Sequence, residues 1–306
     1  MAPWLRPHSP EAQAMAVLFA QYLAVAAVIF TVVAVLVVYA IVRYRARPGA
    51  PEPRESHGSR AAEIAWTAIP LAIVLGLFVL TVRTMAFVDA PQQPERAPDL
   101  TITGHQWWWL ARYPGGAVTA NEIHIPAGRR LLARVDAADV IHDFWAPELA
   151  RKIDAIPGRE SYIWLEADAP GVYQGTCSEF CGMQHAGMHF QVIAEPEGQF
   201  SAWLERQAAP PSPPEGLAAD GARLFSERKC GDCHAVLPSD TRLLSGPPLG
   251  HVASRMRLGG DRANTPANMA LWVNEPQTIK PGNRMPDQHL SAADVQALTA
   301  YMESLR

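Results

Sequence analysis

The chain has 306 residues, a formal net charge of −4 at pH 7 and a hydrophobic share of 49%. So small a charge argues against a nucleic-acid partner. The hydrophobic residues are concentrated in the first ~90 positions, as a membrane-anchored protein requires, so the composition excludes a single soluble domain. All four cysteines belong to two short motifs, which leaves none for a structural disulfide.

Two uncharged segments predict membrane-spanning helices. Residues 16–42 exceed the ~20 residues needed to cross the hydrocarbon core, and they are too long for the apolar part of a signal peptide. Residues 64–82 form the second segment and contain Pro70, which a membrane helix tolerates where neighbouring helices satisfy the freed backbone groups. We therefore predict a two-helix transmembrane hairpin in a first domain, residues 1–90, surrounded by membrane lipid.

The loop between the two segments carries an arginine cluster that indicates the orientation of the hairpin. The positive-inside rule places this loop in the cytoplasm, so both termini and the remaining domains face the periplasmic side of a bacterial inner membrane. Neither segment contains a histidine, so neither can ligate a haem iron at membrane depth, and any oxygen chemistry there must belong to another subunit. The cluster comprises Arg43, Arg45, Arg47, Arg54 and Arg60.

Residues 91–205 are expected to form an all-β sandwich, because short alternating segments are separated by Gly and Pro turns. Three consecutive tryptophans, Trp107 to Trp109, cannot all point into one core, since neighbouring strand residues alternate faces. At least one must be exposed or lie at an interface, and an aromatic belt at the membrane surface is the alternative to a functional role. The expected strands are residues 100–106, 121–125, 130–135, 161–166, 172–176 and 189–194.

The loop 177–188 concentrates metal-binding side chains. It offers the thiols of Cys177 and Cys181, the imidazole of His185 and the thioether of Met188, and His142 is the natural further donor. Soft sulfur donors with imidazole favour copper, and with one backbone carbonyl the set would make a two-copper electron-transfer centre. A disulfide has no use for His185, and a structural zinc site has no use for Met188.

A proline-rich linker, residues 206–216, precedes a last domain, residues 217–306, that carries Cys230-Gly-Asp-Cys233-His234. This is the attachment signature of a c-type haem, with His234 on the iron. A thioredoxin-like pair or half of a zinc site is the alternative, but no βαβ pattern surrounds the motif and no second cysteine pair follows it.

The sixth ligand of this haem is predicted to be Met285, in a loop before the final helix. The competing residues are Met256, Met269, His251 and His289. An amphipathic helix is expected over residues 217–229. A capping box, in which Ser291 is followed three residues later by an acidic residue, is expected to open the final helix.

The copper loop resembles that of cytochrome c oxidase subunit II, and with the haem motif the whole chain resembles a caa-type subunit II. The resemblance implies a multi-domain fold: the transmembrane hairpin, an all-β cupredoxin-like Greek-key sandwich, and an all-α class I cytochrome c domain. It also implies that Cys177 and Cys181 are bridging thiolates. His142 and His185 would be the terminal imidazoles, and Met188 the weak thioether. Glu179 would supply its backbone carbonyl to copper, and its side chain would face a magnesium or manganese site shared with subunit I.

Three further roles are implied by the same resemblance. Glu63, before the second helix, matches a glutamate at the entrance of a proton channel, where a solvated flanking residue is the alternative. Trp107, directly after Gly-His-Gln, matches the tryptophan that receives electrons. Asp139 matches a carboxylate near the face where the electron donor docks, with a plain turn residue as the alternative.

The resulting prediction is the electron-accepting subunit of a haem–copper terminal oxidase. Electrons from an external cytochrome or a quinol-dehydrogenase complex would reach the haem c, then the copper pair, then subunit I, where dioxygen becomes water. Subunit III is a further expected partner. Two alternatives remain: the copper-containing subunit of a nitric oxide reductase, against which Glu63 and Glu179 argue, and a membrane-tethered electron shuttle without a catalytic partner.

Overall fold

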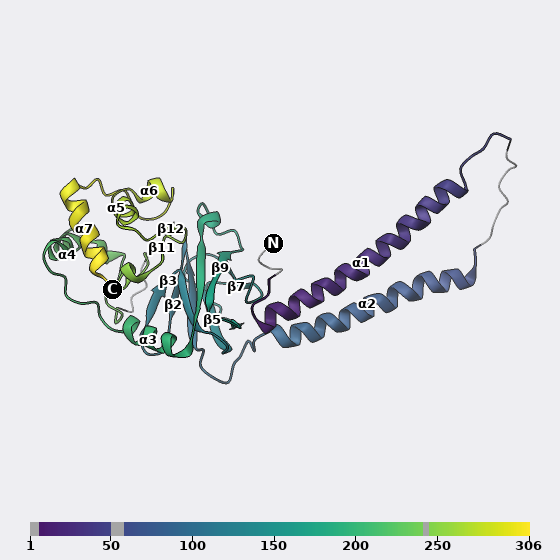
Figure 1. Cartoon of the computed structure of the whole chain (residues 1–306), viewed down its shortest axis with the longest axis horizontal. Helices are drawn as coiled ribbons and strands as arrows, with labels where there is room; N and C mark the ends of the chain where they lie inside the picture. Colours follow the sequence, from purple (N-terminus) through teal and green to yellow (C-terminus); the bar gives the residue numbers. More distant parts are fainter. Residues whose placement is uncertain (1–5, 50–57, 241–244) are drawn as a thin grey trace. The chain divides into compact units, whose positions relative to one another are not determined.

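The computed structural model of the chain describes residues 6–49, 58–240 and 245–306. It divides into two compact units, Gln13–Val88 on the one hand and Met1–Ala12 with Asp89–Arg306 on the other. Figure 1 gives the order of the elements along the chain. Each unit is described separately below.

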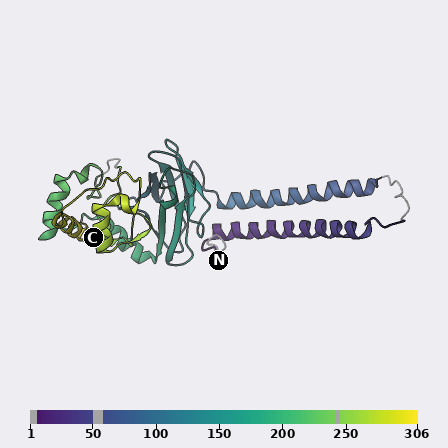
Figure 2. The same cartoon turned by 90° about the horizontal axis from the view of Figure 1, so that it is seen from above.

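The first unit is a pair of long apolar helices, α1 (Pro10–Arg43) and α2 (Arg60–Val88). They run side by side in Figures 1 and 2, and the hydroxyls of Tyr22 and Thr81 are 2.7 Å apart between them. Their apolar side chains are largely exposed in the isolated chain, as side chains that face lipid would be. Both helices are long and apolar enough to cross a membrane, and both exceed the segments predicted for them.

The arginine cluster flanks this helix pair. Arg43 ends α1 and Arg60 begins α2, whereas Arg54 lies outside the described residues. At its other end α1 begins at Pro10. Proline is favoured at the first helical position because it lacks an N–H, and an N–H there would have no partner within the helix. Glu11 in this first turn belongs to the same unit as Arg130, and its buried carboxylate forms an ion pair with that residue.

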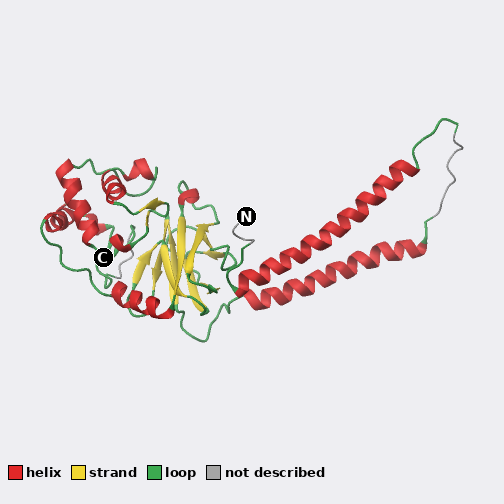
Figure 3. Ribbon diagram, in the orientation of Figure 1, coloured by secondary structure: helices red, strands yellow, loops and turns green. Residues whose placement is uncertain are grey.

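The second unit contains a sandwich of two five-stranded sheets, shown as yellow arrows in Figure 3. Strands β1 and β5 pair in parallel in one sheet, and β4 and β10 do so in the other, so both sheets are mixed. The first sheet has the order β3 (Val118–Ala120), β2 (Trp108–Arg112), β1 (Leu100–His105), β5 (Leu131–Ala137), β8 (Ser161–Leu165). The second has the order β4 (Glu122–Pro126), β10 (His189–Glu195), β9 (Gly171–Cys177), β6 (His142–Trp145), β7 (Ile153–Ala155).

Three aromatic rings contact one another in the core of the sandwich. Trp109 is fully buried, and its ring centroid lies 5.4 Å from that of Phe144 and 5.7 Å from that of Phe190. The two phenylalanine rings stack at 4.4 Å. Such aromatic contacts add to the stabilisation given by buried area alone.

The six predicted strands are confirmed, and four short strands, β2, β3, β6 and β7, were not predicted. Helix α3 (Glu197–Ala208) packs on the sandwich, where the rings of Trp203 and His124 stack at 4.0 Å. Because α3 extends to Ala208, it includes the first residues of the predicted 206–216 linker.

The remaining residues form a small helical domain that borders a cavity. The predicted helix is confirmed as α4, and the Ser291 hydroxyl caps α7 by accepting from the Asp294 N–H. Helices α4 and α7 cross so closely that a Cβ at Gly221 would lie 2.0 Å from the Ala297 carbonyl oxygen. The elements are α4 (Leu217–Glu227), η3 (Cys230–Asp232), η4 (Val252–Ser254), β11 (Arg257–Leu258), β12 (Arg262–Ala263), α5 (Pro266–Asn274), α6 (Pro276–Ile279) and α7 (Ala292–Ser304).

Candidate metal centres

The sulfur-rich loop connects the adjacent strands β9 and β10. Cys177 ends β9, and the short helix η2 (His185–Gly187) lies just before β10. The N–H of Cys177 donates to the Met188 carbonyl at 3.0 Å, which closes the base of the loop. Two strands of one sheet therefore fix both ends of the segment that carries the donors.

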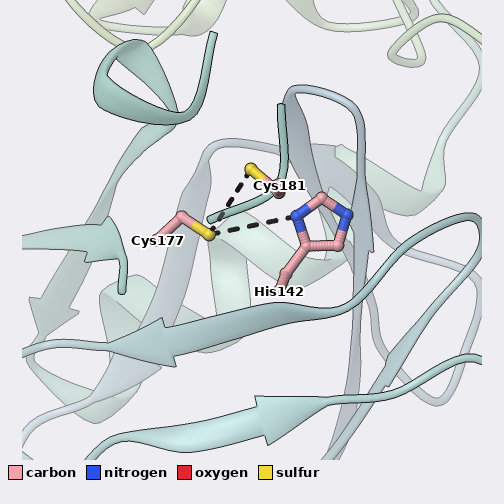
Figure 4. Close-up of side chains that lie close together, drawn as sticks. All are labelled: His142, Cys177 and Cys181. Atoms are coloured by element: carbon pink, nitrogen blue, oxygen red, sulfur yellow. Dashed lines mark hydrogen bonds between the residues drawn. The ribbon is translucent and has the colours of Figure 1, made fainter. Parts of the chain in front are cut away.

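Three donors from two segments meet above the sandwich core (Figure 4). The Sγ atom of Cys177 lies 3.8 Å from that of Cys181 and 3.9 Å from Nδ1 of His142. All three side chains are buried, and their ligand atoms lie close enough together to hold a metal ion. His142 reaches this point from β6, the strand next to β9.

The other predicted ligands border the same cluster. Nδ1 of His185 and Sδ of Met188 each lie 3.7 Å from Sγ of Cys181. The carbonyl oxygen of Glu179 lies 3.2 Å from Sγ of Cys177, whereas the Glu179 side chain is exposed. The structure thus brings together every donor of the predicted two-copper set.

The electrostatics of the two thiols favour a cationic occupant. The sulfurs are too far apart to be bonded, and both cysteines are free. The hydrogen bond from Cys181 lowers the pKa of Cys177 to about 3, and the neighbouring Cys177 raises the pKa of Cys181. These opposite shifts describe one thiolate beside one thiol, and deprotonation of both would require metal ions to supply positive charge between them. The residues therefore fit a copper pair, since a closed zinc site would not use the thioether.

His142 is held from its far side by Asp139. Its Nε2 lies 2.9 Å from the Asp139 carboxylate, so Nδ1 faces the sulfurs. Burial raises the pKa of Asp139, but hydrogen bonds from His142 and from the N–H groups of Gln106 and Val140 outweigh it and lower the pKa to about 2. A carboxylate behind a ligating imidazole fixes the ring and its tautomer. A Cβ at Gly104 would lie 2.8 Å from the His142 ring, so only glycine leaves the ring in place.

Trp107 contacts the copper loop directly. Its indole N–H donates to the Cys181 carbonyl at 3.0 Å, and the Gln106 amide donates to the same oxygen at 2.8 Å. Both residues also line the cavity of the helical domain. The requirement that one tryptophan lie at an interface is met, because Trp107 and Trp108 both border this cavity whereas Trp109 is in the sandwich core.

A cavity of about 350 Å³ lies between the helical domain and the sandwich, and Cys230, Cys233 and His234 line it. Nδ1 of His234 lies 2.7 Å from the Pro247 carbonyl, which leaves Nε2 as the free ring nitrogen. Burial lowers the pKa of this imidazole, so it is neutral and able to ligate a metal. A thiol pair beside such an imidazole at an apolar cavity fits a covalently attached haem.

The candidates for the sixth haem ligand differ in position. Met285 and Met269 line the cavity, whereas the competitors Met256, His251 and His289 are absent from its lining. Met269 is part of the buried core cluster beneath the cavity, and Met285 comes from a loop outside that cluster. This arrangement favours Met285.

The last sequence candidate, Glu63, lies in the first turn of α2 and is exposed. Sequence reasoning missed three residues at the boundary of the two globular domains: Lys280, Arg284 and Glu122. Lys280 lies in the loop before Met285, where no periodicity or motif marks it. Its burial results from tertiary contacts and could not be predicted from the sequence.

The fold and these sites define a membrane-anchored protein that joins a cupredoxin-like copper domain to a cytochrome c domain. Three family descriptions match the chain: cytochrome c oxidase subunit II, transmembrane domain, over residues 6–83; its periplasmic domain, over residues 117–195; and cytochrome c, over residues 218–306. The chain belongs to the cytochrome c oxidase subunit II family, which forms part of haem–copper terminal oxidases.

Curated relatives cover nearly the whole chain. The chain is 37% identical to cytochrome c oxidase subunit 2 of Alkalihalophilus pseudofirmus, over 99% of this chain and 90% of the relative. It is 33% identical to the subunit 2 of Bacillus sp. strain PS3, over 83% and 77%. A crystal structure of the periplasmic domain of cytochrome oxidase subunit II from Bradyrhizobium japonicum is 32% identical, covering 37% of this chain and 95% of that one, with a TM-score of 0.35. The predicted family and fold class are confirmed.

Proposed function

We propose that the chain receives electrons at its own haem c and passes them through a dinuclear copper centre to subunit I. The observation that carries this proposal is the convergence of two thiols, two imidazoles, a thioether and a carbonyl above one rigid strand pair. When bound, the haem and the copper pair supply one-electron chemistry that the side chains themselves lack. A scaffold that holds its ligands rigidly limits the rearrangement that accompanies each electron.

The side chains have separate roles in this proposal. Cys177, Cys181, His142 and His185 would hold the copper ions through their two thiolates and two imidazoles. Asp139 keeps His142 in its ligating tautomer. The thioether of Met188 and the backbone carbonyl of Glu179 would complete the ligand set.

On the haem side, Cys230 and Cys233 would hold the haem covalently, and His234 and Met285 would ligate its iron. A His/Met pair raises the haem potential relative to a bis-His pair, which suits an electron donor to copper. Trp107 lies between the two sites, since it borders the haem cavity and donates to the copper loop.

The subunit is proposed to lie in the bacterial inner membrane, with both metal domains on the periplasmic side. This orientation follows from the arginine cluster between the helices. Subunit I and subunit III are the proposed partners, and an external cytochrome or a quinol-dehydrogenase complex is the electron donor. Glu63 lies at the mouth of a proton channel, and the exposed Glu179 carboxylate contributes to a magnesium or manganese site with subunit I.

The test is cyanide-sensitive oxygen uptake by the purified complex, driven by ascorbate and a mediator. We expect uptake in the wild type, with copper and iron both bound to this chain. In Cys177→Ser the haem should still be reduced, but the copper site should be mononuclear at most and uptake should be lost. Nitric oxide consumption without oxygen uptake would favour the reductase, and a chain that always isolates without subunit I would favour the shuttle.

A further inference from the structure

Lys280 is a buried cation at the boundary between the copper and haem domains, which lie within one compact unit. Its Nζ donates to the carbonyl oxygens of Gly187 at 2.9 Å, Trp107 at 3.0 Å and Gly259 at 3.3 Å. An ammonium has three N–H donors, and here each has a carbonyl partner. The first two carbonyls belong to the copper domain and the third to the haem domain. Burial of an ammonium is costly without such partners, so the contacts require this close docking.

The two copper-domain carbonyls belong to the segments that shape the copper loop. Gly187 directly precedes Met188, and Trp107 donates through its indole to the Cys181 carbonyl. One ammonium therefore ties together the two sides of the copper loop. On the haem side, Gly259 lies against the ring of Trp272, and both residues line the haem cavity.

The loop that carries Lys280 continues along the copper domain up to Met285. Arg284 donates to the side-chain oxygen of Gln106 at 2.6 Å and lies 3.6 Å from the Asp139 carboxylate. Gly282 lies between Lys280 and Arg284 in this loop, and a Cβ there would lie 2.0 Å from Sδ of Met183. The glycine therefore permits the loop to lie close to the Met183 side chain. The carboxylate predicted to dock an external donor thus already has a partner from the same chain.

We infer that Lys280 is a positioning residue for electron transfer within the chain, fixing the loop that ends at Met285 against the copper loop and Trp107. This role rests on the proposed function. One electron leaves the haem site, which is oxidised, and arrives at the copper site, which is reduced, and no bond is made or broken. Lys280 is not one of the proposed metal ligands: its side chain borders the haem cavity, and it acts through the carbonyls of Trp107 and Gly187.

The test is Lys280→Met in the full chain within the assembled complex, because methionine keeps the length of the side chain and removes the charge. After rapid reduction of the haem by a photoreductant, haem and copper absorbance are followed separately. We expect haem reduction to persist, while transfer from haem to copper slows by about ten- to a hundredfold, as for lost positioning. Both midpoint potentials are measured, and the slowing must exceed what their change accounts for. Arg223→Met, which removes a half-exposed cation of the same domain, is the matched control and should leave the transfer rate unchanged.

A second readout does not depend on electron transfer. The amide N–H groups of Met256 and Arg257 donate across the domain boundary to the Glu122 carboxylate at 2.7 and 2.9 Å. Their hydrogen exchange should be faster in Lys280→Met than in the wild type, because the docked state opens more often. Should Lys280→Met fail to load both metals, Arg284→Gln decides in its place, since that side chain is 49% exposed and lies at the rim.

The outcomes separate this inference from the relay itself. A fully loaded Lys280→Met protein with wild-type exchange and a transfer rate within about twofold of the wild type would remove the positioning role. The relay would then stand. A wild-type chain in which the copper site is never reduced by its own haem would overturn both.

Discussion

At the residue scale, Met188 allows the copper ligand set to be tested without disturbing the fold. It is fully buried, and its Sδ lies 3.7 Å from Sγ of Cys181. Met188→Leu conserves volume, so it should cost less than about 1.5 kcal/mol of folding free energy and keep copper bound. Loss of a weak sulfur donor should raise the midpoint potential of the copper centre, measured by redox titration of its optical bands. Met183→Leu, an exposed position in the same loop, is the control, and an unchanged Met188→Leu signature would remove Met188 from the ligands.

The sixth haem ligand is a second question for single residues. Met285→Ala should abolish the absorption at the red end of the spectrum that is typical of methionine–iron bonding and should lower the haem potential. Met269→Leu should keep both, because Met269 packs in the core cluster of the helical domain. Loss of the band in Met269→Leu, with the band intact in Met285→Ala, would reverse the assignment.

At the scale of elements, β4 is joined to the β11 segment by one carboxylate. Glu122 is 3% exposed, and it accepts two N–H groups of the helical domain. Glu122→Ala leaves these part-buried N–H groups without their carboxylate partner, so it should lower the free energy of unfolding of the helical domain by about 2 kcal/mol. Glu122→Gln keeps an oxygen acceptor and should lower it less. Denaturant titration followed by haem absorbance measures both, and equal stability of the two variants would contradict the role of these hydrogen bonds.

The elements also show how far the sequence could be interpreted. The donors of the copper loop and the Cys-x-x-Cys-His motif are close in the chain, so their chemistry could be predicted without coordinates. The short strands β2 and β6 were missed because the tryptophan run in β2 lacks clean alternation and β6, which carries His142, has only 4 residues. The position of Lys280 could not be predicted, since its three carbonyl partners come from distant segments of the chain.

At the scale of the whole molecule, fusion of donor and acceptor in one chain changes the kinetics of their encounter. A covalent link keeps the haem domain at an effective concentration of about millimolar or more. The contacts of Lys280 and Glu122 are buried, so ions in solution screen them little. Transfer between the two metal sites should therefore be a first-order step that responds neither to dilution nor to salt.

Flash reduction of the haem in the purified complex tests this directly. We expect the rate of haem-to-copper transfer to stay constant over about a hundredfold dilution and between about 0.05 and 0.5 M salt, a range over which exposed charge pairs become strongly screened. Reduction of the haem by an external cytochrome is the internal control, because it is bimolecular and must slow on dilution. A transfer rate that falls with rising salt would mean that the haem domain docks through partly exposed charge pairs such as Arg284 and Asp139, and that the buried lysine does not hold it in place.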